Sequence, residues 1–303
     1  MRLFNLELTP ANIIFMSNVA LHRAHMRLFG ITDPSSADYI SGDTFRTFAA
    51  RIFDEREECE ASEIQAGDIV FVGLRRLDIF FNTVFPKVRV KFILISHNGD
   101  LGISKSYTKY ANDHKIIHWF SQNVLFAHPK LTPIPIGLEN LDYYNHGITA
   151  IFDNLLTHPT TKKSKILYGF SLSTNPKKRG NAKKVLDALS IAQPLPERLN
   201  SKQYLEQLVQ YQFVASPPGN GEDCIRTWEA LYLGVIPIVE SSVLTRSFVS
   251  RGLPLFLIDS WKELERYNEK ELEKLYTQYM KKSRMDALSS GYWKCMVEEK
   301  YEI

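Results

Sequence analysis

Short apolar runs that alternate with longer, more polar stretches are the feature that most constrains the fold of this 303-residue chain. In the first half these runs lie at residues 12–16, 68–72, 91–96, 115–120 and 132–136. Several are almost wholly apolar, as strands covered on both faces tend to be, and the segments between them are long enough for helices. Helices are predicted at 43–54 and 77–84. The pattern indicates a parallel α/β fold.

The same alternation begins again after a polar connection at about residues 143–163. Strands are predicted at 165–172, 212–215, 235–239 and 255–258, with helices at 176–190 and 201–211. A chain of this length suits two domains of about 150 residues each. We therefore expect two Rossmann-like domains, 1–155 and 156–285, and a C-terminal helix at 286–303 that packs back on the first domain.

Composition and charge exclude several classes of protein. Hydrophobic residues at 44% and charged residues at 23% are typical of a globular chain, not of a disordered or coiled-coil one. The formal charge of +3 is too small for a protein that binds duplex nucleic acid. Residues 162–184 nevertheless carry a cluster of lysines and arginine and no acidic residue. The positive charge is therefore local to the second half.

The cysteines and the apolar runs bear on the compartment. Cys59, Cys224 and Cys295 are widely spaced, which predicts neither a disulfide framework nor a zinc site and favours a reducing environment. Glu7 and Pro10 interrupt the first apolar stretch, and no run approaches the roughly 20 residues of a membrane helix. We expect a cytoplasmic protein with no transmembrane segment.

The most informative stretch is QFVASPPGNGEDCIRTWEALYLGVIPIVE at residues 212–240. It predicts a strand, a Pro/Gly-rich turn at 216–222, a helix from about Asp223 to Gly234, and a second strand. Gly219 and Gly221 would let backbone N–H groups approach an anion at the start of the helix, where the helix dipole favours phosphate.

Asp223, Arg226 and Glu229 follow at intervals of three and share one face of the predicted helix. In a nucleotide site, Arg226 would contact the diphosphate and Glu229 the ribose hydroxyls. Alternatively, both acids pair with Arg226 on a solvated helix face, with Asp223 as the N-cap. Gly219, Gly221 and Cys224 also match the spacing of a GxGxxG fingerprint, but a cysteine stands at the third position, which makes that signal weak.

SPPGNGEDCIRTWEALYLGVIPIV at 216–239 resembles the C-terminal signature of exostosin-like glycosyltransferases, glycosyltransferase family 47. HNGD at 97–100 and WFSQNVLFAHPKLTPIPIGL at 119–138 are also similar to that group. The resemblance implies a GT-B fold, in which two Rossmann-like domains with parallel sheets face a central cleft. It places the sugar donor on the C-terminal domain and the acceptor on the N-terminal domain.

The resemblance also implies inverting transfer without a metal, from a UDP-sugar such as UDP-xylose, UDP-GlcNAc or UDP-glucuronate, to a hydroxyl of a glycan or glycoprotein. No two aspartates lie two residues apart, so the Asp-x-Asp motif of the metal-dependent GT-A class is absent from the sequence. We expect no metal and no cofactor other than the donor. The expected donor-binding residues are Arg179, Ser216, Pro218, Gly219, Asn220, Gly221, Asp223, Arg226 and Glu229.

An inverting transfer needs a general base for the acceptor hydroxyl. Ligands of open α/β sheets bind at the carboxyl ends of strands. Asp100 and His97 follow the predicted strand at 91–96, and Asp78 follows the one at 68–72 less directly. Asp100 is the favoured base, with His97 as base or orienting partner. A plain turn role for Asp100 in Asn-Gly-Asp stays open.

Two functions from other classes remain as alternatives. One is an NAD(P)-dependent oxidoreductase, based on the partial glycine motif. The other is a catalytically silent glycan-binding relative, which would bind donor or acceptor without transferring sugar. The expected partners are a nucleotide-sugar donor and a glycan or glycoprotein acceptor, with no nucleic acid.

Overall fold

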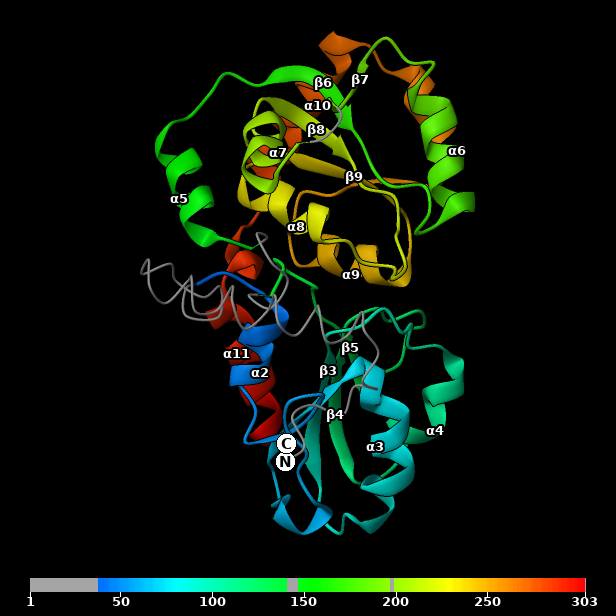
Figure 1. Cartoon of the computed structure of the whole chain (residues 1–303), viewed down its shortest axis with the longest axis vertical. Helices are drawn as coiled ribbons and strands as arrows, with labels where there is room; N and C mark the ends of the chain where they lie inside the picture. Colours follow the sequence, from blue (N-terminus) through cyan, green and yellow to red (C-terminus); the bar gives the residue numbers. More distant parts are fainter. Residues whose placement is uncertain (1–37, 141–146, 197–198, 303) are drawn as a thin grey trace, which may run out of the picture. The chain divides into compact units, whose positions relative to one another are not determined.

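A computed structural model describes residues 38–140, 147–196 and 199–302. Its contacts divide the chain into two compact units, shown in Figure 1. The first unit comprises the described residues of Met1–Thr149 and Ser289–Ile303, and the second unit is Ala150–Leu288. The strand predicted at 12–16 and the beginning of the connection predicted at 143–163 lie outside the described residues.

The first unit contains a five-stranded parallel sheet whose strands follow one another in sequence order. The strands are β1 (Arg51–Phe53), β2 (Ile69–Gly73), β3 (Phe92–His97), β4 (Ile116–Ser121) and β5 (Leu131–Pro133). Every residue of β2 and β3 is buried, as the apolar runs predict for strands covered on both faces. The helices are α2 (Gly42–Thr47), α3 (Leu77–Thr83), α4 (Thr108–Ala111) and α11 (Ser290–Glu298).

The helix predicted at 43–54 is wrong in its second half. The α2 helix starts at the N-cap Ser41, whose side chain accepts a hydrogen bond from the Thr44 amide, and it ends at Thr47. Residues 51–53 form β1 instead, which pairs in parallel with β2. The Phe53 ring packs against Phe80 with centroids 5.5 Å apart. Ladder hydrogen bonds and this burial therefore override the helical spacing of the apolar residues.

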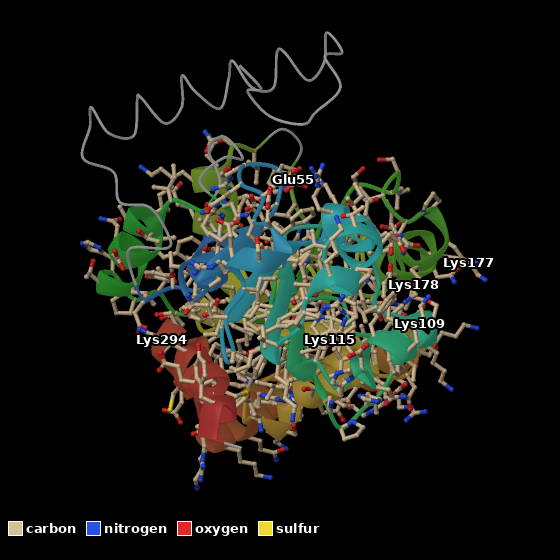
Figure 2. The ribbon with its side chains drawn as sticks, turned by 90° about the horizontal axis from the view of Figure 1, so that it is seen from below. Glu55, Lys109, Lys115, Lys177, Lys178 and Lys294 are labelled. Carbon is tan, nitrogen blue, oxygen red and sulfur yellow. The ribbon has the colours of Figure 1, made fainter. Side chains whose placement is uncertain are left out.

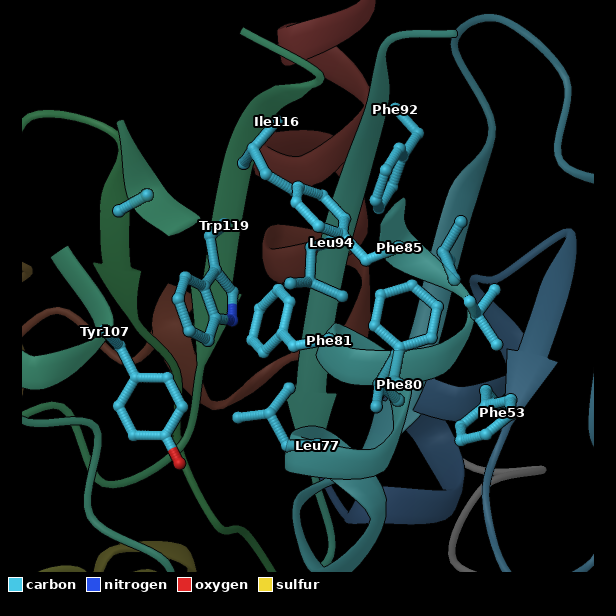
Figure 3. Close-up of a cluster of buried hydrophobic side chains, with 14 of the residues drawn as sticks. Phe53, Leu77, Phe80, Phe81, Phe85, Phe92, Leu94, Tyr107, Ile116 and Trp119 are labelled. Atoms are coloured by element: carbon cyan, nitrogen blue, oxygen red, sulfur yellow. The ribbon is translucent and has the colours of Figure 1, made fainter. Parts of the chain in front are cut away.

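One face of this sheet is covered by α3 and α4 and holds an aromatic core, drawn in Figure 3. Phe80 and Phe81 of α3 point into it, and the Phe81 ring lies edge-on to Trp119 of β4 with centroids 5.5 Å apart. Such edge-to-face pairs add to the stabilisation from burial alone. The core fixes α3 and the carboxyl ends of the strands beside it.

The opposite face is covered by α2 and by α11, which lie side by side in Figure 1. Phe45 of α2 and Trp293 of α11 are both buried, with ring centroids 6.2 Å apart. The Asp38 carboxylate accepts hydrogen bonds from the Ser289 hydroxyl at 2.7 Å and the Ser290 amide at 3.1 Å. The segment after residue 288 thus belongs structurally to the first unit.

The second unit contains a five-stranded parallel sheet in the order β10-β9-β8-β6-β7. The strands are β6 (Lys163–Tyr168), β7 (Ala192–Pro194), β8 (Tyr211–Ala215), β9 (Ile236–Glu240) and β10 (Phe256–Ile258). The helices are α5 (Thr149–Thr157), α6 (Pro176–Leu186), α7 (Ser201–Leu208), α8 (Ile225–Tyr232), α9 (Val243–Ser250) and α10 (Glu269–Lys282). Two Rossmann-like domains with parallel sheets are confirmed.

Short 3-10 helices complete the connections of both units. They are η2 (Ala61–Glu63), η3 (Leu74–Arg76), η4 (Phe85–Lys87), η5 (Lys105–Tyr107), η6 (Trp261–Arg266), η7 (Asp286–Leu288) and η8 (Glu299–Glu302). Within the described part of the chain, no helix combines the length and hydropathy of a membrane span. The compartment remains a prediction.

The strand order of the second unit reverses at β6. The chain passes from β6 to β7 on one side of it and then crosses to β8 on the other side. In open α/β sheets such a reversal opens a crevice at the carboxyl ends of the two strands, where ligands bind. The loops 169–175 after β6 and 216–224 after β8, called here the crevice loops, are linked by hydrogen bonds at the carboxyl ends of these two strands.

Candidate functional site

The loop at 216–224 joins β8 to α8 and is held by its own neighbours. The Ser216 hydroxyl pairs with the Thr227 hydroxyl at 2.9 Å, and the Ser216 amide donates to the Ile238 carbonyl at 2.9 Å. Pro218 is buried, Gly219 and Gly221 are half-buried, and Asn220 is exposed. The loop therefore has a fixed base on the sheet and an exposed tip.

The α8 helix begins at Ile225 with Cys224 as its N-cap, slightly later than the sequence predicts. Asp223 lies before the helix, and its carboxylate accepts hydrogen bonds from the Cys224 amide at 2.8 Å and from Trp228 Nε1 at 2.9 Å. Asp223 is therefore not part of the helical stripe predicted with Arg226 and Glu229. Its carboxylate fixes the first turn of α8 and the buried indole.

Arg179 ties the two crevice loops together. It lies in α6 after the N-cap Asn175 and is 8% exposed. Its Nε donates to the Pro218 carbonyl at 3.0 Å, and its Nη1 donates to the Ser171 carbonyl at 2.9 Å. The Asn175 amide adds a hydrogen bond to the Gly219 carbonyl at 3.1 Å. The start of α6 therefore holds the Pro/Gly-rich loop in place.

Arg226 reaches the other crevice loop from α8. Its Nη2 donates to the Gly169 carbonyl at 2.6 Å. The guanidinium carbons of Arg226 and Arg179 lie 5.9 and 5.8 Å from the centroid of the same Phe170 ring. Burial, with the nearby Arg226 charge, lowers the pKa of Arg179. Two positive charges thus converge on residues 169–171, which makes the crevice attractive to an anion.

Glu229 lies one turn further along α8 and is 8% exposed. Burial raises the pKa of its carboxyl to about 7, against the opposing effects of Arg226 and Tyr204. The alternative of a solvated helix face, with both acids paired to Arg226, is wrong because Asp223 and Glu229 are both buried. Tyr204 of α7, which the sequence reasoning missed, lies close enough for Arg226 and Glu229 to affect its pKa.

Most of the basic residues of 162–184 have structural contacts outside the crevice. Lys162 Nζ donates to the Val209 carbonyl at 2.7 Å and to the Leu233 carbonyl at 3.0 Å, at the C-terminal ends of α7 and α8. Lys183 pairs with Asp187 at 2.7 Å. Lys178 lies 3.4 Å from Glu222, whereas Lys177 is exposed (Figure 2). Among the basic residues of this segment, Arg179 donates hydrogen bonds to both crevice loops, and Lys178 contacts Glu222 of the 216–224 loop.

His97 ends β3 in the first unit and is 1% exposed. Its Nε2 lies 2.9 Å from the Pro135 carbonyl, and its Nδ1 accepts a hydrogen bond from the Asn98 amide at 2.8 Å. Burial lowers the pKa of the ring to about 4, so it is neutral at pH 7. Since both nitrogens are occupied, His97 suits an orienting role better than that of a base.

A chain of amide side chains extends from this histidine. Asn98 has a φ of 62°, and its Oδ1 accepts a hydrogen bond from Asn140 Nδ2 at 2.8 Å. Asn140 Oδ1 in turn accepts from the Asp43 amide at the start of α2, at 2.9 Å. Spacing could not reveal this network because its members are distant in sequence. It fixes the backbone at Asn98, two residues before Asp100.

The other two base candidates differ in their contacts. Asp100 is exposed and follows β3 by three residues. Asp78 is exposed in the first turn of α3 and accepts a hydrogen bond from the Tyr107 hydroxyl at 2.8 Å. Among the described residues, no group of three or more His, Cys, Asp or Glu side chains is arranged to hold a metal ion. The base, the metal independence and the donor-binding roles remain predictions.

Comparisons with known proteins give only distant likenesses. No protein-family model matches the chain, and no curated protein matches it. Three similar solved structures can be described. The first is an α,α-trehalose-phosphate synthase (UDP-forming) from Burkholderia vietnamiensis, which is 9% identical to this chain. The match covers 80% of this chain and 76% of the synthase chain, with a TM-score of 0.46.

The second, from E. coli, is described as trehalose-6-phosphate bound with UDP-2-fluoro glucose; it is 8% identical, with coverages of 80% and 75% and a TM-score of 0.43. The third is a UDP-GlcNAc 2-epimerase from Methanocaldococcus jannaschii in complex with UDP-GlcNAc and UDP, 11% identical, with coverages of 71% and 69% and a TM-score of 0.31.

Proposed function

We propose that this chain is a glycosyltransferase of the GT-B class that binds a nucleoside-diphosphate sugar on its second unit. The observation that carries the proposal is the meeting of Arg179, Arg226 and buried Glu229 where the strand order reverses between β6 and β8. The resemblance of residues 216–239 to exostosin-like glycosyltransferases supports the same function. Two Rossmann-like domains are the components of a GT-B protein.

The diphosphate of the donor would bind between the crevice loops. Its negative charge grows when the bond to the sugar breaks, and two guanidinium groups together with the start of α8 would stabilise it. Arg226 Nε is buried and has no hydrogen-bond partner among the described residues, so a donor is left for a ligand. Glu229 would accept hydrogen bonds from the ribose hydroxyls.

The proposed reaction is an inverting displacement without a metal. The acceptor hydroxyl oxygen attacks the anomeric carbon, the bond from that carbon to the diphosphate oxygen breaks, and the hydroxyl proton passes to the Asp100 carboxylate. The bonding electrons leave with UDP. The donor class comprises UDP-xylose, UDP-GlcNAc and UDP-glucuronate, and the acceptor is a glycan or glycoprotein hydroxyl.

The oxidoreductase alternative is less well supported. The dinucleotide fingerprint belongs to the first strand-to-helix turn of a Rossmann domain. Here the partial motif follows β8, the third strand of its unit in chain order, and its third position is the N-cap Cys224. The side chain of Arg179 also lies against Gly219, where a β-carbon would be placed. These features favour a diphosphate-binding turn that differs from the turn of the dinucleotide fingerprint.

Calorimetric titration tests donor binding. UDP, GDP and NAD⁺ are titrated, with EDTA and with Mg²⁺, onto the wild type, Arg226→Ala and the control Arg251→Ala. Arg251 is a partly buried arginine at the end of α9, where it donates to the Ser247 carbonyl at 2.7 Å. We expect saturable UDP binding that weakens at least roughly tenfold in Arg226→Ala, as for a lost charged hydrogen bond, and is retained in Arg251→Ala.

Turnover is tested by UDP release from a panel of UDP-sugars, first with water and then with glycan acceptors. Release with at least one donor is the expected result. Failure of UDP and GDP to bind under every condition contradicts the proposal, and saturable NAD⁺ binding in their place favours the oxidoreductase. Binding of UDP without release from any sugar identifies a silent relative.

A further inference from the structure

A cavity of about 810 Å³ lies in the first unit, alongside the α3 helix. Arg76, Ile79 and Thr83 line it from α3, and their spacing of three and four residues places them on one flank of the helix. The other lining residues come from the segments 53–64 and 84–90, which precede and follow that helix in the chain. The cavity has the volume of a small-molecule site, and it shares no residue with the crevice loops or with the base candidates.

Much of the lining is apolar. Phe53, Ile64 and Val84 are buried, and they belong to the core whose aromatic residues Figure 3 shows. Ile79 is 43% exposed, although it is a large apolar side chain in the middle of α3. Because contact between water and an apolar side chain is unfavourable, a ligand that covered Ile79 would gain binding free energy from its burial.

The charges along the cavity do not balance. The basic lining residues are Arg76, Lys87 and Arg89, and the acidic ones are Glu58 and Glu60. Arg76 forms an ion pair with Glu58, and Glu60 belongs to the capping box of η2. Lys87 and Arg89 are exposed, and within the described part of the chain neither has an ion-pair partner. Two positive charges, two residues apart in sequence, are therefore available to an anion.

Arg76 adds a hydrogen-bond donor that the fold leaves unused. Its Nε is buried and has no hydrogen-bond partner among the described residues, while its Nη2 contacts Glu58. Its guanidinium carbon lies 5.3 Å from the centroid of the Phe53 ring. A buried N–H group without a partner has lost its hydration without compensation, so an acceptor atom of a ligand would stabilise it.

We infer that this cavity binds an amphipathic anion, which is an organic phosphate or carboxylate that carries an apolar group. The apolar group would cover Ile79, and the anionic group would bind Lys87 and Arg89. A neutral apolar ligand would leave both charges unused, and a free inorganic anion would leave Ile79 in water. The inference does not rest on the proposed function, because every lining residue belongs to the first unit and none has a role in the proposed transfer.

The experiment uses four probes that separate the two parts of such a ligand. They are octyl phosphate, octanoate, octanol and inorganic phosphate, each titrated by calorimetry onto the wild type below the concentration at which micelles form. We expect octyl phosphate or octanoate to bind at least roughly tenfold more tightly than octanol and than inorganic phosphate. The tighter of the two amphipathic probes identifies the headgroup as a phosphate or a carboxylate.

A double variant tests the anionic part. Lys87→Gln with Arg89→Gln should weaken binding of the amphipathic probe by roughly fivefold and leave octanol binding unchanged. The matched control is Lys105→Gln with Lys109→Gln, which removes the same charge from two exposed positions of the first unit that do not line the cavity. That control should bind every probe as the wild type does.

Ile79→Ala tests the apolar part. It should weaken binding of the amphipathic probe and of octanol alike, by roughly threefold, because less apolar surface is buried. The control is Leu125→Ala, since Leu125 is 46% exposed and does not line the cavity. Because all of these side chains are exposed, the unfolding midpoint of each variant should stay close to that of the wild type.

Three results would overturn the inference. The first is a wild type that shows no saturable binding of either amphipathic probe, or binds octanol or inorganic phosphate equally well. The second is a Lys87 and Arg89 double variant that keeps the wild-type affinity for the amphipathic probe, or loses no more of it than the Lys105 and Lys109 control. The third is an Ile79→Ala variant that binds as Leu125→Ala does. In each case the proposed function, which is measured with UDP, is unaffected.

Discussion

The guanidinium group of Arg179 occupies the space that a side chain at position 219 would need. A β-carbon built on Gly219 would stand 2.8 Å from Arg179 Nη2, inside van der Waals contact. The sequence suggests glycine here so that backbone amides can approach an anion. The structure adds a second reason, which is the close approach of an arginine that is hydrogen bonded to the neighbouring Pro218 carbonyl.

Gly219→Ala should therefore weaken nucleotide binding by displacing Arg179. We expect UDP affinity to fall by roughly tenfold, since hydrogen bonds made by a charged group contribute about 1.5–3 kcal/mol. Gly180→Ala is the matched control, because Gly180 lies inside α6 and a β-carbon there meets nothing within 4 Å. That control should keep UDP affinity and gain about 0.5–1 kcal/mol of stability. Equal affinities in both variants would show that Arg179 is not displaced or not needed.

Nucleotide binding should weaken as the pH falls through 7. The carboxyl of Glu229 has a pKa of about 7, and only its ionised form accepts hydrogen bonds from both ribose hydroxyls. UDP affinity of the wild type should drop by up to roughly 30-fold between pH 8 and pH 5.5. Because UDP itself also titrates in this range, the same measurements on Glu229→Gln, whose side chain does not titrate, serve as the reference. The UDP affinity of that variant should change less with pH than the affinity of the wild type. Parallel profiles of the two proteins would exclude Glu229.

The same group should have the opposite effect on folding. Because the folded state raises the pKa of Glu229 from 4.5 to about 7, it binds more protons than the unfolded state between those values. The stability that the neutral carboxyl provides is present below pH 4.5 and is lost as the pH rises to 7. Glu229→Gln should therefore be more stable than the wild type at pH 8, by up to about 3 kcal/mol, and equal to it at pH 4.5. Urea unfolding at the two pH values measures both differences.

His97 should make the first unit sensitive to acid. Its pKa falls from 6.5 to about 4 on folding, so the unfolded state binds more protons between those values. Its contribution to stability is present above pH 6.5 and is lost as the pH falls to 4. Urea unfolding should show a loss of about 2 kcal/mol between pH 7 and pH 5 from this residue. His97→Gln, which cannot titrate, should lower the stability at pH 7 and reduce that pH dependence; an unchanged dependence would assign it to other groups.

Asp100→Asn should separate binding from transfer. The amide cannot accept the proton of the acceptor hydroxyl, so UDP release with acceptor should fall by roughly 10²- to 10⁴-fold, the usual contribution of a general base. UDP affinity should be unchanged. Asp78→Asn is the control, because its amide oxygen can still accept the hydrogen bond of Tyr107. If Asp100→Asn keeps full turnover and Asp78→Asn loses it, the base is Asp78.

The sequence predicted the parts of the site whose signal is local. The strand, turn and helix of 212–240 lie within one continuous stretch, and so the crevice loop and the positions of Arg226 and Glu229 follow from spacing. Tyr204 could not be predicted, because it comes close to Arg226 and Glu229 from another helix, α7. The His97, Asn98 and Asn140 network depends likewise on contacts between distant residues.

The clustering of charge in the sequence was the least reliable predictor of the site, because it does not show which groups a basic side chain contacts in the folded chain. Lys162 belongs to the basic cluster in sequence, yet it is half-buried against the C-terminal ends of two helices, and desolvation lowers its pKa to about 8. A lysine that donates to the last carbonyls of a helix is common at a helix C-terminus. Arg179 lies in the same segment and ends in the crevice.

The first unit is discontinuous in sequence, since the whole second unit is inserted between Thr149 and Ser289. During synthesis the second unit has all of its residues available while α11 has still to be made. Until Trp293 emerges, Phe45 and the sheet face beneath it lack their cover. The later unit can therefore fold before the earlier one is complete, which reverses the usual N-terminal-first order of multidomain chains.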